Sequence, residues 1–211
     1  MKTLFTFIFA FGILAANTSS ASTCNELQSP ESGNWTVLTE TSKGHVAFQN
    51  SWKTTHEGRL EVNNGEIAFN EQAVPEKFAF SISVAQVVNN RTNRQFLVNS
   101  EQYFDTRNYP NIEFESQRIQ FHPEQKLYYA FGTIIVKNQA MPIAIPFELV
   151  GFDEVNDQRQ AIFEASFKLD RTDFGVGSEN EKMGEFMTFS ITLKAEQPQL
   201  PAMEVGTPDV K

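Results

Sequence analysis

Apolar and polar residues alternate with a period of two along most of the chain after Thr36. The clearest runs have an apolar residue at every second position and cover residues 78–85, 143–149, 163–169 and 187–194. Successive side chains of a strand point to opposite faces of a sheet. The pattern therefore predicts antiparallel strands with one apolar face and one solvated face.

Turn-forming residues separate these runs. Residues 63–65 (Asn-Asn-Gly) are predicted to close a hairpin, and residues 138–139 (Asn-Gln) lie between two strand-like runs. Residues 94–104 lack clean alternation, and we expect a short helix or an ordered loop there. About eight or more strands at this spacing predict an all-β antiparallel barrel or sandwich.

The N-terminus has the pattern of a cleaved secretory signal. Lys2 precedes an apolar run over residues 4–16, which is too short to cross a hydrocarbon core of about 30 Å. Ser19 and Ala21 are small residues at suitable positions for cleavage after Ala21. We therefore expect residues 1–21 to be removed on secretion.

The remaining chain divides into three parts. Residues 22–33 are expected to form a flexible segment that carries Cys24, and residues 34–195 the folded β domain. Residues 196–211 contain three prolines and little pattern, so a disordered tail is expected. Cys24 is interpreted as a free thiol, with lipidation as the less favoured alternative.

Composition narrows the function classes. A chain of 211 residues with 40% hydrophobic and 20% charged residues fits one globular domain. The net charge of -9 argues against a nucleic-acid partner, because phosphate backbones are also negative. The single cysteine, Cys24, excludes a disulfide framework and a multi-cysteine zinc site. The 20 Phe residues, against four Tyr, indicate either a large aromatic core or an apolar cavity.

No enzyme motif emerges from the sequence. His45, His56 and His122 each lack a second His or Cys at ligand spacing, and no serine-nucleophile or phosphate-loop motif is present. The charged residues of 170–173 are interpreted as structural ion pairing at a strand end. We therefore expect a protein that is not an enzyme, with no catalytic residue, cofactor or metal ligand.

Four segments carry motifs in a consistent order. Residues 171–176 (Arg-Thr-Asp-Phe-Gly-Val) match an R-x-D-F-G pattern. Residues 100–116 resemble S-x-D-F-F-D, with Gln102 and Tyr103 as departures, followed by Y-P-x-I-x-F-x-S. Residues 132–143 are similar to G-x-L-T-I-x-G with a following P-V, but Asn138 replaces the turn Gly and Met141 the Lys before Pro. Residues 58–67 match an early G-x-F with a following G-x-I. Together they cover about residues 34–195, and this set resembles the YceI family of periplasmic lipid-binding proteins.

The resemblance implies a lipocalin-like antiparallel β-barrel in the periplasm. Such a barrel would hold a long apolar ligand, typically a polyisoprenoid or a lipid with a quinone-type tail. The large members of the apolar faces are the expected ligand lining: Phe48, Phe80, Ile82, Phe114, Ile145, Phe147, Phe167 and Phe189. Arg94 is the candidate for the ligand head group, since a guanidinium pairs with phosphate, and an ion-pair role is its alternative.

Two function hypotheses follow. The first is a carrier for an isoprenoid or similar lipid; the second is a ligand-free barrel that acts as a protein-interaction or stress-related envelope factor. A homodimer and transient contact with a membrane or membrane proteins are left open. Residues 171–175 are expected to fix the fold: Gly175 would adopt a positive φ, and Asp173 would accept backbone hydrogen bonds.

Overall fold

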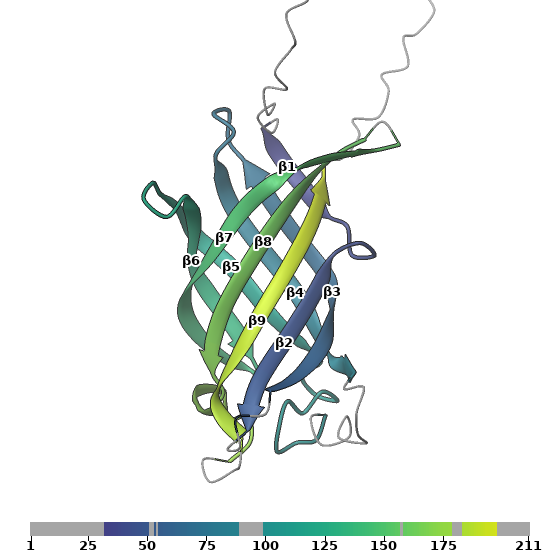
Figure 1. Cartoon of the computed structure of the whole chain (residues 1–211), viewed down its shortest axis with the longest axis vertical. Coiled ribbons are helices and arrows are strands. Elements are labelled where there is room, and N and C mark those ends of the chain that lie inside the picture. Colours follow the sequence, from purple (N-terminus) through teal and green to yellow (C-terminus); the bar gives the residue numbers. More distant parts are fainter. Residues whose placement is uncertain are drawn as a thin grey trace, which may run out of the picture.

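The structure, a computed structural model, describes residues 32–50, 53, 55–88, 99–156, 158–178 and 183–197. This part of the chain contains nine strands and one 3-10 turn, and no α-helix (Figure 1). The elements are β1 (Gly33–Val37), β2 (Lys43–Asn50), β3 (Thr55–Phe69), β4 (Pro75–Val88), β5 (Asn111–His122), β6 (Leu127–Val136), β7 (Gln139–Val155), β8 (Gln158–Asp170), η1 (Thr172–Phe174) and β9 (Met183–Glu196).

The strands close into a ring of antiparallel pairs, which confirms the predicted barrel. The order is β1-β3-β2-β9-β8-β7-β6-β5-β4, and pairing of β3 with β4 closes it. β1 and β2 both lie between β3 and β9, so the nine strands occupy eight positions in the ring. Closure leaves no long unpaired edge for another chain to extend.

The period-two pattern sorts side chains between the inside and the outside of this ring. In β4, Phe78, Phe80, Ile82 and Val84 are buried, as are the alternate residues of β8 and β9. Glu113 and Glu115 on β5 are exposed, whereas Ile112 and Phe114 are buried. The alternation therefore produces an apolar interior and a polar outer surface, as expected.

The hairpin expected at residues 63–65 is wrong. These residues lie inside the continuous strand β3, where the register with β4 shifts between Val62 and Asn64. A Cβ on Gly65 would lie 2.6 Å from Cγ2 of Val37, so β1 passes too close for a larger residue. The Asn-Gly signal thus marks a β-bulge, close to where β3 exchanges its partner β2 for β1.

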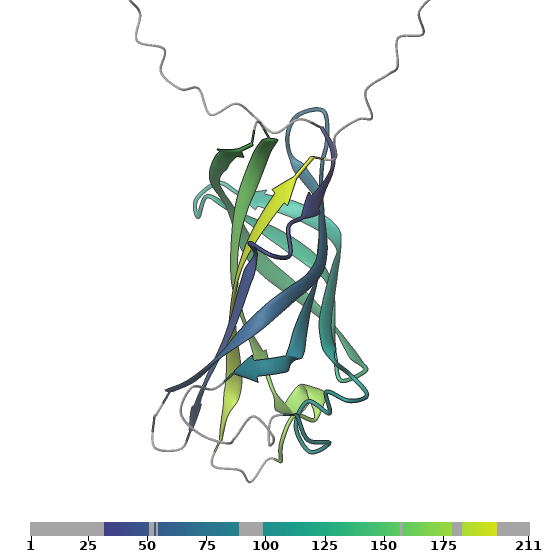
Figure 2. The same ribbon diagram turned by 90° about the vertical axis from the view of Figure 1, so that its right-hand side faces the viewer.

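The two ends of the barrel are built differently. The β3–β4, β5–β6 and β7–β8 connections lie at one end, called here the hairpin end and drawn uppermost in Figures 1 and 2. The longer connections before β5 and β9 lie at the opposite end, called here the clasp end. Residues 99–109 form hydrogen-bonded turns at the clasp end, and residues 94–98 lie outside the described part of the chain.

Arg171 organises the clasp end. Its side chain is 1% exposed. The guanidinium donates to the carbonyls of Val176 (2.8 Å), Gly184 (2.9 Å), Ser178 (3.0 Å) and Met183 (3.2 Å). Within the described residues, the partners of this cation are backbone carbonyls and not the carboxylates that the sequence led us to expect. One side chain thus fixes both arms of the β8–β9 connection.

The turn beside Arg171 confirms part of the expectation. Gly175 has a φ of 62° and closes η1 with a hydrogen bond to Thr172. Asp170, rather than Asp173, supports the turn, because its Oδ1 accepts from the backbone N of Thr172 at 2.9 Å. An Asp just before the turn thus performs the role expected of Asp173.

Two further contacts join the segments of the clasp end. The backbone N of Gly177 donates to the carbonyl of Gln102 at 2.9 Å. Nζ of Lys137, in the β6–β7 turn, donates to the carbonyls of Glu101 and Gly175, both at 2.9 Å. Figure 2 shows the two segments side by side below the barrel. Phe104 and Phe174 from these segments are buried in the core, so they cover this end of the interior.

Candidate functional site

The barrel interior is lined mainly by apolar side chains along the described inward positions, with hydroxyls from Ser116 of β5 and Tyr128 of β6. β8 contributes Ala161, Phe163, Ala165, Phe167 and Leu169, and the inward residues of β4 and β9 are likewise apolar. The buried polar residues of the described chain are Ser42, Ser83, Asp105, Gln160 and Arg171, none of which belongs to these inward series. An interior of this kind can hold an apolar molecule.

The expected lining residues all reach this interior or its edge. Phe48 is partly buried against the core, and seven are fully buried: Phe80, Ile82, Phe114, Ile145, Phe147, Phe167 and Phe189. Their contact with a ligand stays a prediction. Arg94 lies outside the described residues.

Aromatic rings form a continuous column along the interior. From the hairpin end, Trp35 contacts Phe69 (5.7 Å between centroids), which contacts Phe163 (5.9 Å). Phe163 then contacts Phe147 at 6.4 Å. Four further contacts continue the column through Phe78 and Phe80 toward Phe167 and Phe189, at centroid distances of 4.4, 5.9, 6.2 and 5.2 Å.

Several of these contacts cross the barrel. Phe78 on β4 stacks on Phe147 of β7 with an interplanar angle of 7°, although two strands separate β4 from β7. Phe80 on β4 contacts Phe167 on β8, which lies on the opposite side of the ring. The rings therefore touch across the interior at these levels. A chain-like ligand at the same levels has to separate them.

The expected lining omitted four members of this column: Trp35, Phe69, Phe78 and Phe163. Phe78 and Phe163 belong to the same alternating runs as the chosen residues, so the period-two signal already contained them. Trp35 lies in the short strand β1, where five residues give little periodic signal.

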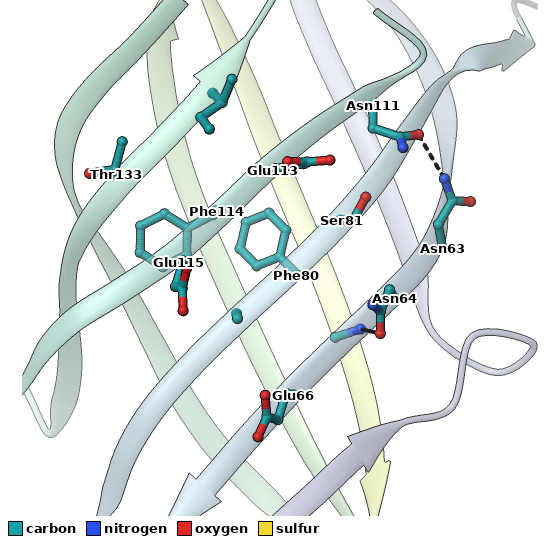
Figure 3. Close-up of a pocket in the computed structure, with 13 residues that line it drawn as sticks. Asn63, Asn64, Glu66, Phe80, Ser81, Asn111, Glu113, Phe114, Glu115 and Thr133 are labelled. Carbon is teal, nitrogen blue, oxygen red and sulfur yellow. Dashed lines mark hydrogen bonds between the residues drawn. The ribbon is translucent and has the colours of Figure 1, made fainter. Parts of the chain in front are cut away.

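A polar groove lies on the outer surface over β3 to β6 and encloses about 620 Å³ (Figure 3). Carboxylates and amides line it, and Nδ2 of Asn63 donates to Oδ1 of Asn111 at 2.8 Å. Phe80 and Phe114 form its floor from the interior side. This lining suits polar groups and does not suit a long apolar chain.

A charge pair lies beside this groove. Nζ of Lys77 lies 2.8 Å from Glu66 and 3.7 Å from Glu115. The hydrogen bond with Glu66 and its negative charge raise the pKa of Lys77 above its ordinary value of 10.5. The pair is solvent-exposed, so its contribution to stability is small.

The described residues offer no site of two other types. No group of three or more His, Cys, Asp or Glu side chains in them is placed to hold a metal ion. None of their helices is long and apolar enough to span a bilayer.

These features define a small closed antiparallel β-barrel with an aromatic interior. The YceI-like domain model matches residues 35–196, and the chain belongs to this family. A UPF0312 protein of Photorhabdus laumondii is 30% identical over 121 residues, which cover 56% of this chain and 61% of that relative.

Solved structures share the fold. BcnA of Burkholderia cenocepacia superposes with a TM-score of 0.62 at 18% identity, covering 75% of this chain and 98% of that one. The YCEI protein of Campylobacter jejuni gives 0.57 at 15% identity, covering 91% and 100%. A polyisoprenoid binding domain from Saccharophagus degradans gives 0.55 at 7% identity, covering 78% and 98%.

Proposed function

We propose that this protein binds a long apolar ligand, of the polyisoprenoid or quinone-tail class, inside the barrel as a carrier or reservoir. The observation that carries the proposal is the unbroken column of aromatic rings, in an interior where the described inward positions carry no charged side chain. The polyisoprenoid-binding domain that shares this fold supports the ligand class. The role requires no catalytic residue.

Ligand binding replaces ring contacts with contacts between rings and ligand. Apolar burial contributes about 25 cal/mol per Å², so even partial enclosure of a long chain is worth several kcal/mol. Part of this gain offsets the separation of stacked rings such as Phe78 and Phe147. The closed barrel stays intact, because the rings move by side-chain rotation within it.

We further propose that the protein works in the periplasm. The support is the signal-like N-terminus, in which Lys2 precedes an apolar run and small residues precede the expected cleavage site. An aqueous compartment between two membranes would need a carrier for water-insoluble lipids. N-terminal sequencing of the protein purified from its own host tests the cleavage, which we expect after Ala21.

Mass spectrometry of an organic extract of the purified protein tests the binding proposal. We expect a stoichiometric long-chain isoprenoid or related lipid in the extract. A folded protein that yields no lipid, and whose melting temperature does not rise when a polyprenol is added, would contradict the proposal.

A second candidate is a ligand-free barrel that binds another protein of the envelope. The ring contacts across the interior favour it, because they already fill the barrel at the levels of Phe78 and Phe80. An empty protein in the extraction experiment is the result that this candidate predicts.

A further inference from the structure

The hairpin end exposes large apolar side chains on three hairpins. Val74, Phe121, Val150 and Val155 are exposed large apolar residues on the hairpins of the hairpin end. They come from three separate connections, β3–β4, β5–β6 and β7–β8, which share this end because β3, β5 and β7 run in the same direction. At the clasp end, Phe104 and Phe174 of the two covering segments are buried, whereas Phe186 and Ile135 are exposed.

Phe121 connects this exposed end with the interior. Its ring is 46% exposed and lies 5.0 Å from the ring of Tyr128, its partner in the β5–β6 register. Tyr128 lies 5.4 Å from Phe147, and Phe147 stacks on Phe78 at 4.4 Å. An unbroken series of ring contacts therefore runs from solvent to the centre of the barrel.

The charges of this end help to identify the surface that it meets. Each hairpin places a carboxylate near its tip: Glu71, Glu124 and Glu154. Two cations accompany them, Lys126 in the same turn as Glu124 and Arg159 opposite Glu154 in the β7–β8 register. Protein interfaces exclude charge from their cores, and these apolar residues are dispersed among acids rather than gathered in one patch. A lipid surface accepts scattered apolar anchors while charged neighbours stay in water.

We propose that the hairpin end docks on a lipid bilayer with neutral or zwitterionic head groups, and that the apolar ligand passes between β5–β6 and the interior along Phe121 and Tyr128. This inference rests on the proposed lipid-binding function for the passage of ligand. Docking itself depends only on the exposed residues. The acidic tips and the net charge of -9 disfavour anionic lipids at low salt.

Vesicle flotation tests the docking with a matched pair of variants. The rim variant is Phe121→Ser combined with Val155→Ser, and the control is Phe186→Ser, which removes a ring that is 55% exposed near the start of β9, at the clasp end. We expect the full chain to float with phosphatidylcholine vesicles, the rim variant to lose about tenfold in affinity, and the control to match the wild type. Adding phosphatidylglycerol should weaken binding at low salt, and added salt should restore it.

Three results would overturn the inference: no flotation of the wild type, unchanged flotation of the rim variant, or an equal loss in the control. The single variant Val155→Ser, expected to lose about threefold, gives the same test if the double variant is unstable.

Polyprenol added from ethanol without vesicles separates this inference from the proposed function. The single variant Val155→Ser, which leaves the ring series of Phe121 and Tyr128 intact, should still take it up, with the same rise in melting temperature as the wild type. Failure of every form to bind polyprenol, with flotation intact, would contradict the proposed ligand and leave the docking surface standing.

Discussion

The clasp end and the hairpin end of the barrel differ in how the connections between strands cover the interior. At the clasp end a buried guanidinium and a lysine bind carbonyls of several segments, and aromatic residues cover the interior. At the hairpin end short turns leave apolar side chains in solvent. We therefore expect local stability to be highest at the clasp end, since local stability is rarely uniform, and the proposed docking assigns ligand access to the hairpin end.

The largest expected effect is at Arg171. Arg171→Met removes four hydrogen bonds to carbonyls and leaves buried acceptors without partners. We expect a loss of about 3 kcal/mol or more in the free energy of unfolding, measured in urea. The control Arg107→Met, at an exposed position of the same end, should stay within about 0.5 kcal/mol of the wild type. Equal losses of stability in the two variants would contradict the stabilising role assigned to Arg171.

The next largest loss of stability is expected for a substitution at Gly175. Its φ of 62° is unfavourable for a residue with a Cβ, although no atom lies within 4 Å of the Cβ position. Gly175→Ala should therefore destabilise by about 1 kcal/mol through backbone conformation alone. Gly151→Ala is the control, because its Cβ position is also open and its φ is not in the left-handed region. A control that loses as much as Gly175→Ala would contradict this explanation.

Lys137 tests whether the turn of β6–β7 ties the clasp segments together. Lys137→Met removes two hydrogen bonds from an ammonium that is partly in solvent, so a loss of about 0.5 kcal/mol is expected. Lys126→Met is matched to it, since Lys126 also has a positive φ, lies in the β5–β6 turn of the opposite end and is exposed. Thermal unfolding should show no change for Lys126→Met.

The smallest effect is expected for the exposed pair of Lys77 and Glu66 near the hairpin end. Since the fold raises the pKa of Lys77, its contribution is fully present below the ordinary value of 10.5 and disappears as the pH rises through the raised pKa. Wild type and Lys77→Met should differ slightly near neutral pH and converge in strong alkali, as judged by urea unfolding. A difference that grows with pH would contradict the assigned sign.

The sequence was sufficient to predict most strands and their inward faces, because alternation in runs such as residues 163–169 directly encodes the two faces of a strand. The turn expected at residues 63–65 failed because Asn-Gly serves both hairpins and bulges, and the choice depends on β1, which is distant in sequence. The sequence also could not predict the carbonyl partners of Arg171, because every residue has a backbone carbonyl and its type does not show which one the guanidinium binds.

The sequence predicted that the interior is apolar and aromatic, but not which rings contact one another. The sequence indicated that Phe80, Phe147 and Phe167 share one side of their strands, and the structure buries all three. Stacking of Phe78 on Phe147 depends on how strands on opposite sides of the ring are staggered, which no local pattern specifies.

The most direct test of the central claim is a crystal structure of the protein loaded with a polyprenol. A hydrocarbon chain between two rings needs carbon contacts of about 4 Å on each side, so the centroids of such a pair should lie about 7–8 Å apart. We predict that Phe78 and Phe147 part from 4.4 Å to that separation, with the chain between them. A polyprenol bound outside the barrel, with the two rings still stacked, would contradict the claim.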